Sequence, residues 1–208
     1  MKLIIKSSVC LIFTLLAFPV FSTEIINIYH AKNGSALIIN SGANNKFMIA
    51  GGATDQGAST ASDCFAKATV RIKKLPNYYE GNIDPASNEL LSVTSDEVSG
   101  RGLGIYISND LIRVGNVELD GICADGVDFS GFYKKISNND PRYKSAFIYF
   151  MSLEDQDAMH LVKVGDIKGA KSGLEPFIRN YNPKWGDGNG NGKLIDRIFS
   201  DYSKLGDD

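Results

Sequence analysis

The chain has 208 residues, 43% of them hydrophobic, with 24 acidic and 22 basic side chains and a formal net charge of −2. This apolar fraction is that of a folded domain and excludes a disordered chain, which lacks the residues for a core. The slightly acidic balance excludes the strongly basic surface expected of a protein that binds nucleic acid or anionic membranes.

The first 22 residues have the pattern of a secretory signal peptide, in which Lys2 and Lys6 precede an apolar run over residues 9–20. We predict cleavage after Ser22, which leaves 20 basic and 24 acidic residues. The run is shorter than the roughly 20 residues of a transmembrane helix, and a lipoprotein would have to use Cys10, which lies inside the run. The prediction is an exported protein, periplasmic or secreted, with no membrane span in the mature chain.

Cys64 and Cys123 are the only cysteines that follow the signal peptide. An oxidising compartment allows such a pair to form one disulfide. Two separate buried thiols are the alternative. The remaining residues, 23–208, contain no repeat or long linker and have the length of a single domain.

Short apolar segments separated by turn residues open this domain. Residues 25–30 predict a strand, and residues 35–40 and 46–52 predict a hairpin. Residues 62–75 predict a helix that ends at Pro76, because Phe65, Ala66, Thr69, Val70 and Lys73 share one helical face.

The second half of the chain predicts more strands and then two helices. Residues 89–100 read as a strand that enters a polar turn, and further strands are expected over residues 103–108, 111–124, 145–151 and 159–166. Residues 166–181 predict a helix weakened by glycine and proline, and residues 193–205 an amphipathic terminal helix. The predicted fold class is therefore α/β, with mixed β-sheets and flanking helices.

Three stretches resemble the metallo-β-lactamase superfamily, nearest the ComEC/Rec2-like hydrolase branch. "INIYHAKNGSALIINSGANNKFMIAGGA" is similar to the opening strands of that branch, "LIRVGNVELDGICA" to its middle hairpin, and "SAFIYFMSLEDQDAMHLVKVGDIKGA" to its late hairpin, which ends in Thr-Gly-Asp before a helix. The resemblance implies an αββα fold, possibly truncated, and a hydrolase that uses two metal ions.

The metal ligands that this resemblance implies are mostly missing. The family signature His-x-His-x-Asp-His has its best match in "SVTSDEVSG", where Ser92, Thr94 and Glu97 replace the histidines and Asp96 is kept. Asp166 alone matches the carboxylate that bridges the metals. Zinc is therefore not expected, whereas a remnant site of Asp96, Glu97 and Asp166 would suit a hard cation with oxygen ligands. The competing interpretation of Asp166 is a cap for the helix that follows it.

A second constellation lies near the C-terminus, in "DGNGNGKLID". Oxygen-bearing side chains at alternate positions followed by glycine are typical of a calcium loop, and the candidate ligands are Asp187, Asn189, Asn191 and Asp196. The alternative is a plain loop in which Asn191 caps the last helix. Trp185, just before the loop, is expected to seal the helix against the core or to mark a binding surface.

Three functions remain open from the sequence. The first is an exported protein with a metallo-β-lactamase-like fold that has lost its two-metal site and binds a protein or small-molecule partner. The second is a metal-dependent hydrolase with a carboxylate-rich site, and the third is a secreted module stabilised by calcium. No serine has a Gly-x-Ser-x-Gly context or a histidine close in sequence; His160, in an apolar segment, is expected to be a core residue, and His30 is left open between a core residue and a base.

Overall fold

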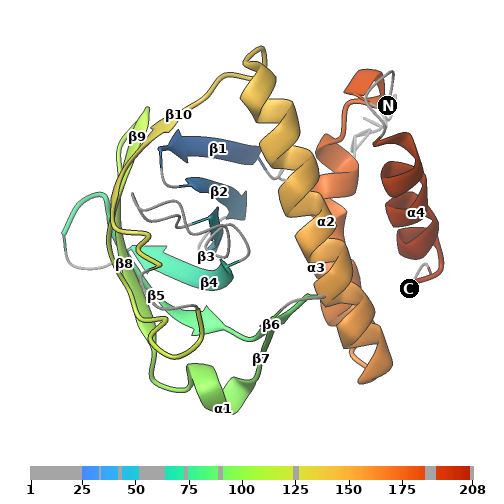
Figure 1. The fold of residues 1–208 in the computed structure, drawn as a ribbon, viewed down its shortest axis with the longest axis horizontal. Coiled ribbons are helices and arrows are strands. Elements are labelled where there is room, and N and C mark those ends of the chain that lie inside the picture. Colours follow the sequence, from blue (N-terminus) through green and yellow to red (C-terminus); the bar gives the residue numbers. More distant parts are fainter. Residues whose placement is uncertain are drawn as a thin grey trace, which may run out of the picture.

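The computed structural model describes residues 25–32, 34–41, 44–51, 64–72, 75–88, 91–123, 127–185 and 191–206. Its central feature is a closed antiparallel barrel with the strand order β1-β10-β9-β8-β5-β4-β3-β2 (Figure 1). The barrel strands are β1 (Ile25–Ala31), β2 (Gly34–Ser41), β3 (Asn44–Gly51), β4 (Cys64–Ile72), β5 (Tyr78–Asp84), β8 (Gly102–Ile107), β9 (Leu111–Val117) and β10 (Gly131–Lys135).

The remaining elements lie outside the barrel. Between β5 and β8 the chain forms a small hairpin, β6 (Ala86–Ser87) and β7 (Ser92–Val93), and the short helix α1 (Ser95–Val98). After β10 come α2 (Pro141–Lys163), α3 (Ile167–Asn180), the 3₁₀ turn η2 (Pro183–Trp185) and α4 (Gly192–Ser203). These three long helices lie together on one side of the barrel (Figure 1).

The predicted metallo-β-lactamase-like αββα fold is wrong. That architecture needs two sheets between two layers of helices, whereas here eight strands close into a single antiparallel ring. Most neighbours in the ring are also neighbours in sequence, such as β1 with β2 and β8 with β9, so short hairpin connections build the barrel. The strands expected from the opening segments and over residues 103–108 do exist, and the strand expected over residues 111–124 is shorter, Leu111–Val117, but all of them serve a different topology.

The helix expected over residues 62–75 is also wrong, because Cys64–Ile72 is strand β4. Its side chains follow a period of two: Cys64, Ala66 and Ala68 point into the barrel, and Phe65 packs on the outer side. Both faces of β4 are covered here, and a strand buried on both faces has an apolar pattern close to that of a buried helix.

The strands expected over residues 145–151 and 159–166 are instead parts of the 23-residue helix α2. The Asp140 side chain caps its start by accepting a hydrogen bond of 2.9 Å from the Arg142 amide, and Pro141 occupies its first turn. Residues 143, 146–147, 150–151, 154 and 157–158 are buried at helical spacing. The helices expected over residues 166–181 and 193–205 are confirmed as α3 and α4.

Side chains fill the barrel interior. Eight strands leave a bore just wide enough for side chains, and the inward positions carry aliphatic and aromatic residues, among them Ile38, Phe47, Val70, Ile105 and Tyr133, all at most 2% exposed. In the described residues, the interior of the barrel is therefore a packed core.

A second core joins the outer face of β1 to β4 with the three long helices. Ile28, Leu37 and Phe147, all fully buried, belong to it. Trp185 seals its edge, as expected, with ring centroids 5.0 Å from Phe147 and 5.9 Å from Tyr181. One half of the barrel wall is thus covered by helices and the other half is open.

The predicted disulfide is confirmed: Cys64 on β4 bonds to Cys123, with Cα atoms 5.6 Å apart and 59 residues of sequence separation. Closing a loop of this length is expected to stabilise the fold by about 4 kcal/mol in the chain-entropy treatment. None of the helices in the described ranges combines the length and apolar character needed to cross a bilayer. The predicted signal peptide lies outside the described residues.

Candidate functional site

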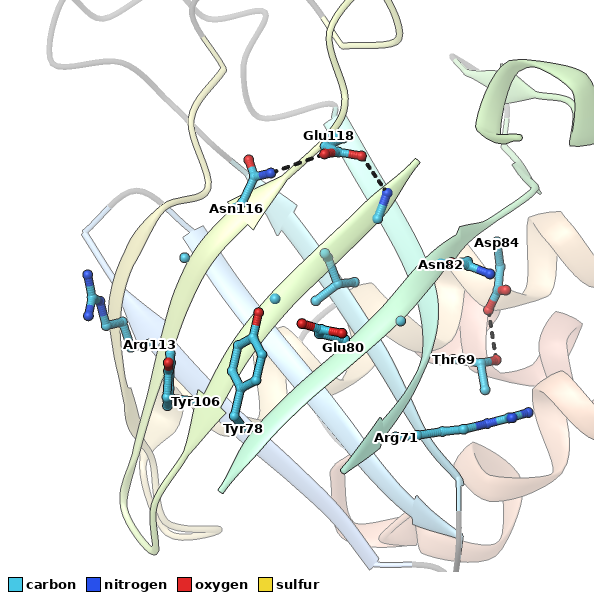
Figure 2. A pocket seen from close by; sticks show the side chains of 15 residues that line it. Thr69, Arg71, Tyr78, Glu80, Asn82, Asp84, Tyr106, Arg113, Asn116 and Glu118 are labelled. Atoms are coloured by element: carbon cyan, nitrogen blue, oxygen red, sulfur yellow. Dashed lines mark hydrogen bonds between the residues drawn. The ribbon is translucent and has the colours of Figure 1, made fainter. Parts of the chain in front are cut away.

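A broad depression lies on the open half of the barrel wall, over β4, β5, β8 and β9. It has a volume of about 770 Å³. Figure 2 shows its labelled side chains along these strands, and Gly81, Gly102, Gly104 and Gly115 belong to the same lining. The lining side chains other than glycine are Thr69, Arg71, Tyr78, Glu80, Asn82, Asp84, Leu103, Tyr106, Arg113, Asn116 and Glu118.

Glycines form the floor of this depression. Gly102 and Gly104 occupy outward positions of β8, where alternation would otherwise place side chains. A Cβ atom on Gly104 would lie 2.7 Å from the Tyr78 hydroxyl, so the tyrosine reaches across bare backbone. Opposite, Gly115 is an extra residue in β9, because Gly104 pairs with Asn116 and Ile105 with Val114. Such a bulge bends its strand and increases the local twist, which explains why this stretch of wall is hollowed.

An aromatic and cationic row crosses four strands; Tyr78, Tyr106 and Arg113 line one end of the depression, and Phe132 continues the row beyond the lining. Tyr78 on β5 is the register partner of Tyr106 on β8, which is the partner of Arg113 on β9, and Arg113 faces Phe132 on β10. The two tyrosine rings are 4.6 Å apart between centroids, and the Arg113 guanidinium lies 5.8 Å from the Phe132 ring. Tyr106 is 41% exposed and Phe132 63% exposed. We name Tyr78, Tyr106, Arg113 and Phe132 the aromatic row.

The walls beyond the aromatic row are polar. Glu118 accepts a 2.8 Å hydrogen bond from the Gly102 amide and a 3.4 Å bond from the Asn116 side chain, which fixes two side chains at one edge. Across the glycine floor, Glu80 and Asn82 project from β5. At the far rim, Thr69 donates its hydroxyl to Asp84 at 3.0 Å. The depression therefore offers carboxylates, amides and guanidinium groups around an aromatic end.

Two ionisable side chains of the depression, Tyr78 and Asp84, have raised pKa values. Desolvation, then the hydrogen bond that the Tyr78 hydroxyl donates to Glu80 and the negative charge of Glu80, raise the pKa of Tyr78 above its usual 10.0. Tyr78 is therefore a neutral phenol at physiological pH and remains a hydrogen-bond donor. Burial raises the pKa of Asp84 above its usual 3.8, against the opposing hydrogen bond from Thr69 and the charge of Lys67.

The carboxylates predicted from the sequence have local structural roles. Glu97 forms a capping box with Thr94, whose backbone amide donates to the Glu97 carboxylate at 2.8 Å. Asp166 caps α3 by accepting a 2.9 Å hydrogen bond from the Gly169 amide, so the capping interpretation is confirmed. Within the described ranges no group of three or more His, Cys, Asp or Glu side chains is placed to hold a metal ion. Asp96, Glu97 and Asp166 are therefore not gathered into such a group.

The predicted calcium loop falls partly outside the described residues, which omit Asp187 and Asn189. Asn191 precedes α4 without a capping hydrogen bond from its side chain, and Asp196 is exposed on that helix. The calcium loop stays a prediction.

His160, expected within a strand, is instead exposed on α2 beside a polar cleft of about 360 Å³ that Ser87, Ser92 and Asp155 also line. These residue types suggest a nucleophile, a base and an orienting acid. The hydrogen bonds do not link these side chains to the histidine: the two serine hydroxyls bond to each other at 3.2 Å, and Asp155 accepts from Arg197 at 3.2 Å. In this part of the described chain no hydrogen bond joins the His160 ring to either a serine or Asp155, so the cleft does not form a triad.

The sequence did not lead us to predict the depression over β4, β5, β8 and β9, which we call the outer-wall depression. One signal for it exists in "RGLGIYIS", where glycines alternate with buried Leu103 and Ile105 before the exposed Tyr106. In comparisons with known proteins, no family model, curated protein or solved structure matches the chain.

Proposed function

We propose that this is an exported binding protein whose outer-wall depression binds a neutral saccharide. The observation that carries the proposal is the aromatic row beside a glycine floor, with acceptors and donors on both walls. The proposal assigns no reaction to the protein.

The chemistry of a sugar ring fits this arrangement. A pyranose has C–H groups on its two faces and hydroxyls around its edge. The C–H groups are attracted to the electron-rich face of an aromatic ring, for which Tyr106 is available at 41% exposure. The hydroxyls both donate and accept, so they match mixed partners such as the carboxylate of Glu80 and the amides of Asn82 and Asn116.

The charge of the depression favours a neutral ligand. Its lining includes two arginines, Arg71 and Arg113, and three acids, Glu80, Asp84 and Glu118. A polyanion such as a nucleic acid would meet this acidic excess, although aromatic rings and arginine would suit its bases. A neutral chain of sugars meets no such repulsion, and the open depression allows a chain to extend beyond it.

Export is supported by the N-terminal pattern of Lys2, Lys6 and the apolar run over residues 9–20. The Cys64–Cys123 disulfide is compatible with an oxidising compartment. A periplasmic or secreted protein meets cell-wall and extracellular polysaccharides, which are the ligands that this depression would bind.

The test is a glycan array probed with the mature chain, followed by calorimetry on the glycans that bind. Tyr106→Ala should weaken binding about tenfold, which corresponds to one aromatic contact worth about 1.4 kcal/mol. Tyr149→Ala is the matched control, because Tyr149 on α2 is 40% exposed but does not line the depression. Binding to no neutral glycan, or equal losses in the two variants, would overturn the proposal.

A further inference from the structure

A second cavity lies where the helices meet the barrel wall, and it is distinct in lining chemistry from the outer-wall depression. It has a volume of about 280 Å³, between β3 and β4 on one side and α2 and α3 on the other. One part of its lining is apolar, with Ile39, Met48 and Leu161. The other part is charged. We name the whole cavity, with its apolar and its charged part, the seam cavity.

The charged part centres on Lys67, an outward residue of β4 that α2 covers. Its ammonium group donates to Glu154 Oε1 at 2.9 Å and to Asp157 Oδ2 at 2.6 Å. The two acids are buried, Glu154 at 4% and Asp157 at 3% exposure. Asp157 uses its second oxygen as well, accepting a 2.6 Å hydrogen bond from the Ser87 amide.

Glu154 differs from Asp157 because only one of its two carboxylate oxygens has a hydrogen-bond partner among the described residues. Its Oε2 atom is buried and has no hydrogen-bond partner among the described residues. A buried carboxylate oxygen without a donor costs free energy, so the site favours a ligand that donates a hydrogen bond there. The α3 backbone leaves room for this carboxylate because residue 173 is glycine: a Cβ atom at Gly173 would collide with Glu154.

Negative charge exceeds positive charge around the seam cavity. Asp84 adds a third carboxylate to Glu154 and Asp157. Lys46 also lines the cavity; its ammonium group donates to the Ser172 carbonyl oxygen at 2.8 Å, and its charge acts to lower the pKa of Asp84. Lys67 is the cation hydrogen-bonded to the two buried acids, and the three carboxylates of the lining exceed its two ammonium groups by one.

We infer that the seam cavity binds a small organic ammonium ion, with its N–H groups donating to Glu154 Oε2 and its hydrocarbon body against Met48 and Leu161. The positive charge of the ligand complements the excess of carboxylates, and the apolar wall contacts the hydrocarbon body of the ligand. A metal ion would not use the apolar wall, and an anion would meet the buried acids. This inference does not depend on the saccharide proposal.

The experiment is a titration of ¹⁵N-labelled mature protein followed by amide chemical shifts, with n-butylammonium as the probe. The amides of Gly169 and Gly173, which line the cavity, serve as local reporters. We expect saturable shifts with n-butylammonium, and shifts at least tenfold weaker in apparent affinity with n-butanol, which lacks the charge, and with butyrate, which reverses it. The melting temperature should rise with n-butylammonium concentration, as for any ligand of the folded state.

Glu154→Gln tests the residue itself. Glutamine keeps an oxygen for Lys67 and removes the unmatched charge, so affinity for n-butylammonium should fall at least tenfold. Glu175→Gln is the control, since Glu175 lies on α3 and pairs with Arg179 rather than lining the cavity.

Equal shifts with n-butylammonium and n-butanol, or no saturable shift with any probe, would overturn the inference. The wild-type comparison decides the matter even where Glu154→Gln does not fold.

Discussion

The two halves of the barrel wall differ in what covers them. Strands β1 to β3 and the start of β4, from Cys64 to Ala66, have apolar side chains on both faces, inside the barrel and beneath the helices, as in the sequences "ALII" of β2 and "FMIA" of β3. The end of β4, from Thr69 to Ile72, and strands β5, β8, β9 and β10 are apolar mainly on the inside, and outside they carry glycine, charged residues and the aromatic row. We call these the covered wall and the open wall.

The two walls of the closed sheet therefore have different roles: the covered wall supports the helices, and the open wall carries the candidate binding site. The covered wall docks the helical layer and holds the second core. The open wall needs no apolar outer face, so its outward positions are available for glycine and polar side chains. Lys67 and Asp84 lie at the boundary, where an outward position passes beneath α2 and a charge must find a partner.

Lys67→Met should produce the largest effect at this boundary. The nearby carboxylates of Glu154 and Asp157 overcome the effect of burial and raise the pKa of Lys67 above its usual 10.5. Its stabilising contribution is therefore fully present below pH 10.5 and is lost only as the pH rises through the folded-state pKa. Methionine leaves two buried acids without their cation, which costs about 3–5 kcal/mol. Urea unfolding at pH 7 measures this change.

Arg71→Met is the control on the same strand and the same face, where the side chain is exposed on the open wall. Its effect should stay within about 0.5 kcal/mol, as for other surface substitutions. A loss at Lys67 no larger than that at Arg71 would show that α2 does not enclose this charge.

The same truncation on the two walls gives the next largest difference. Leu37 on β2 is fully buried beneath the helices, whereas Leu111 on β9 is 39% exposed. Leu37→Ala removes a buried side chain and leaves a cavity, at a cost of about 2–5 kcal/mol. Leu111→Ala should cost less than about 1 kcal/mol. Thermal and urea unfolding of both variants measures the contrast, and equal losses would contradict a one-sided helical cover.

The covered wall also explains which elements can be predicted from sequence. Strands β1 to β3 are short apolar runs between turn residues, and α3 and α4 keep one apolar stripe, so local patterns suffice for them. In α2 the stripe is interrupted by Glu154 and Asp157, which resemble a turn between two strands. Their partner Lys67 is 87 and 90 residues away in sequence. Only the tertiary fold explains why two acids occupy buried helical positions.

The site is harder to predict than the fold, because its parts come from different strands. Tyr78 and Phe132 lie in β5 and β10, for which the sequence gives no strong strand signal. The aromatic row exists only once β5 pairs with β8 and β10 with β9. The family resemblance directs attention to Asp96, Glu97 and Asp166 instead, and the structure uses Glu97 and Asp166 as helix caps. A cap and a metal ligand both require an oxygen at a turn, so sequence alone does not separate them.

The smallest expected effect is a pair of opposite pH responses. Burial raises the pKa of Asp84 above 3.8, so its contribution favours the folded state below that pH and is lost as the pH rises through the folded-state pKa. Asp84→Asn should therefore raise the melting temperature at pH 7, by at most about 2 °C, with no gain near pH 3. Asparagine still accepts the hydrogen bond from Thr69.

Asp140 provides the same substitution with the opposite sign. Hydrogen bonds and the charge of Arg142 lower its pKa to about 2, so its stabilisation is present above pH 3.8 and is lost as the pH falls toward 2. Asp140→Asn should lower the melting temperature at pH 7 and have no effect near pH 2. Scanning calorimetry from pH 2 to 8 separates the two, because Asp84 lies at the edge of the covered wall and Asp140 caps a helix in solvent. If Asp84→Asn were also destabilising at pH 7, the positive charges of Lys67 and Lys46 would outweigh burial at that carboxyl, and the seam would not carry an excess of negative charge.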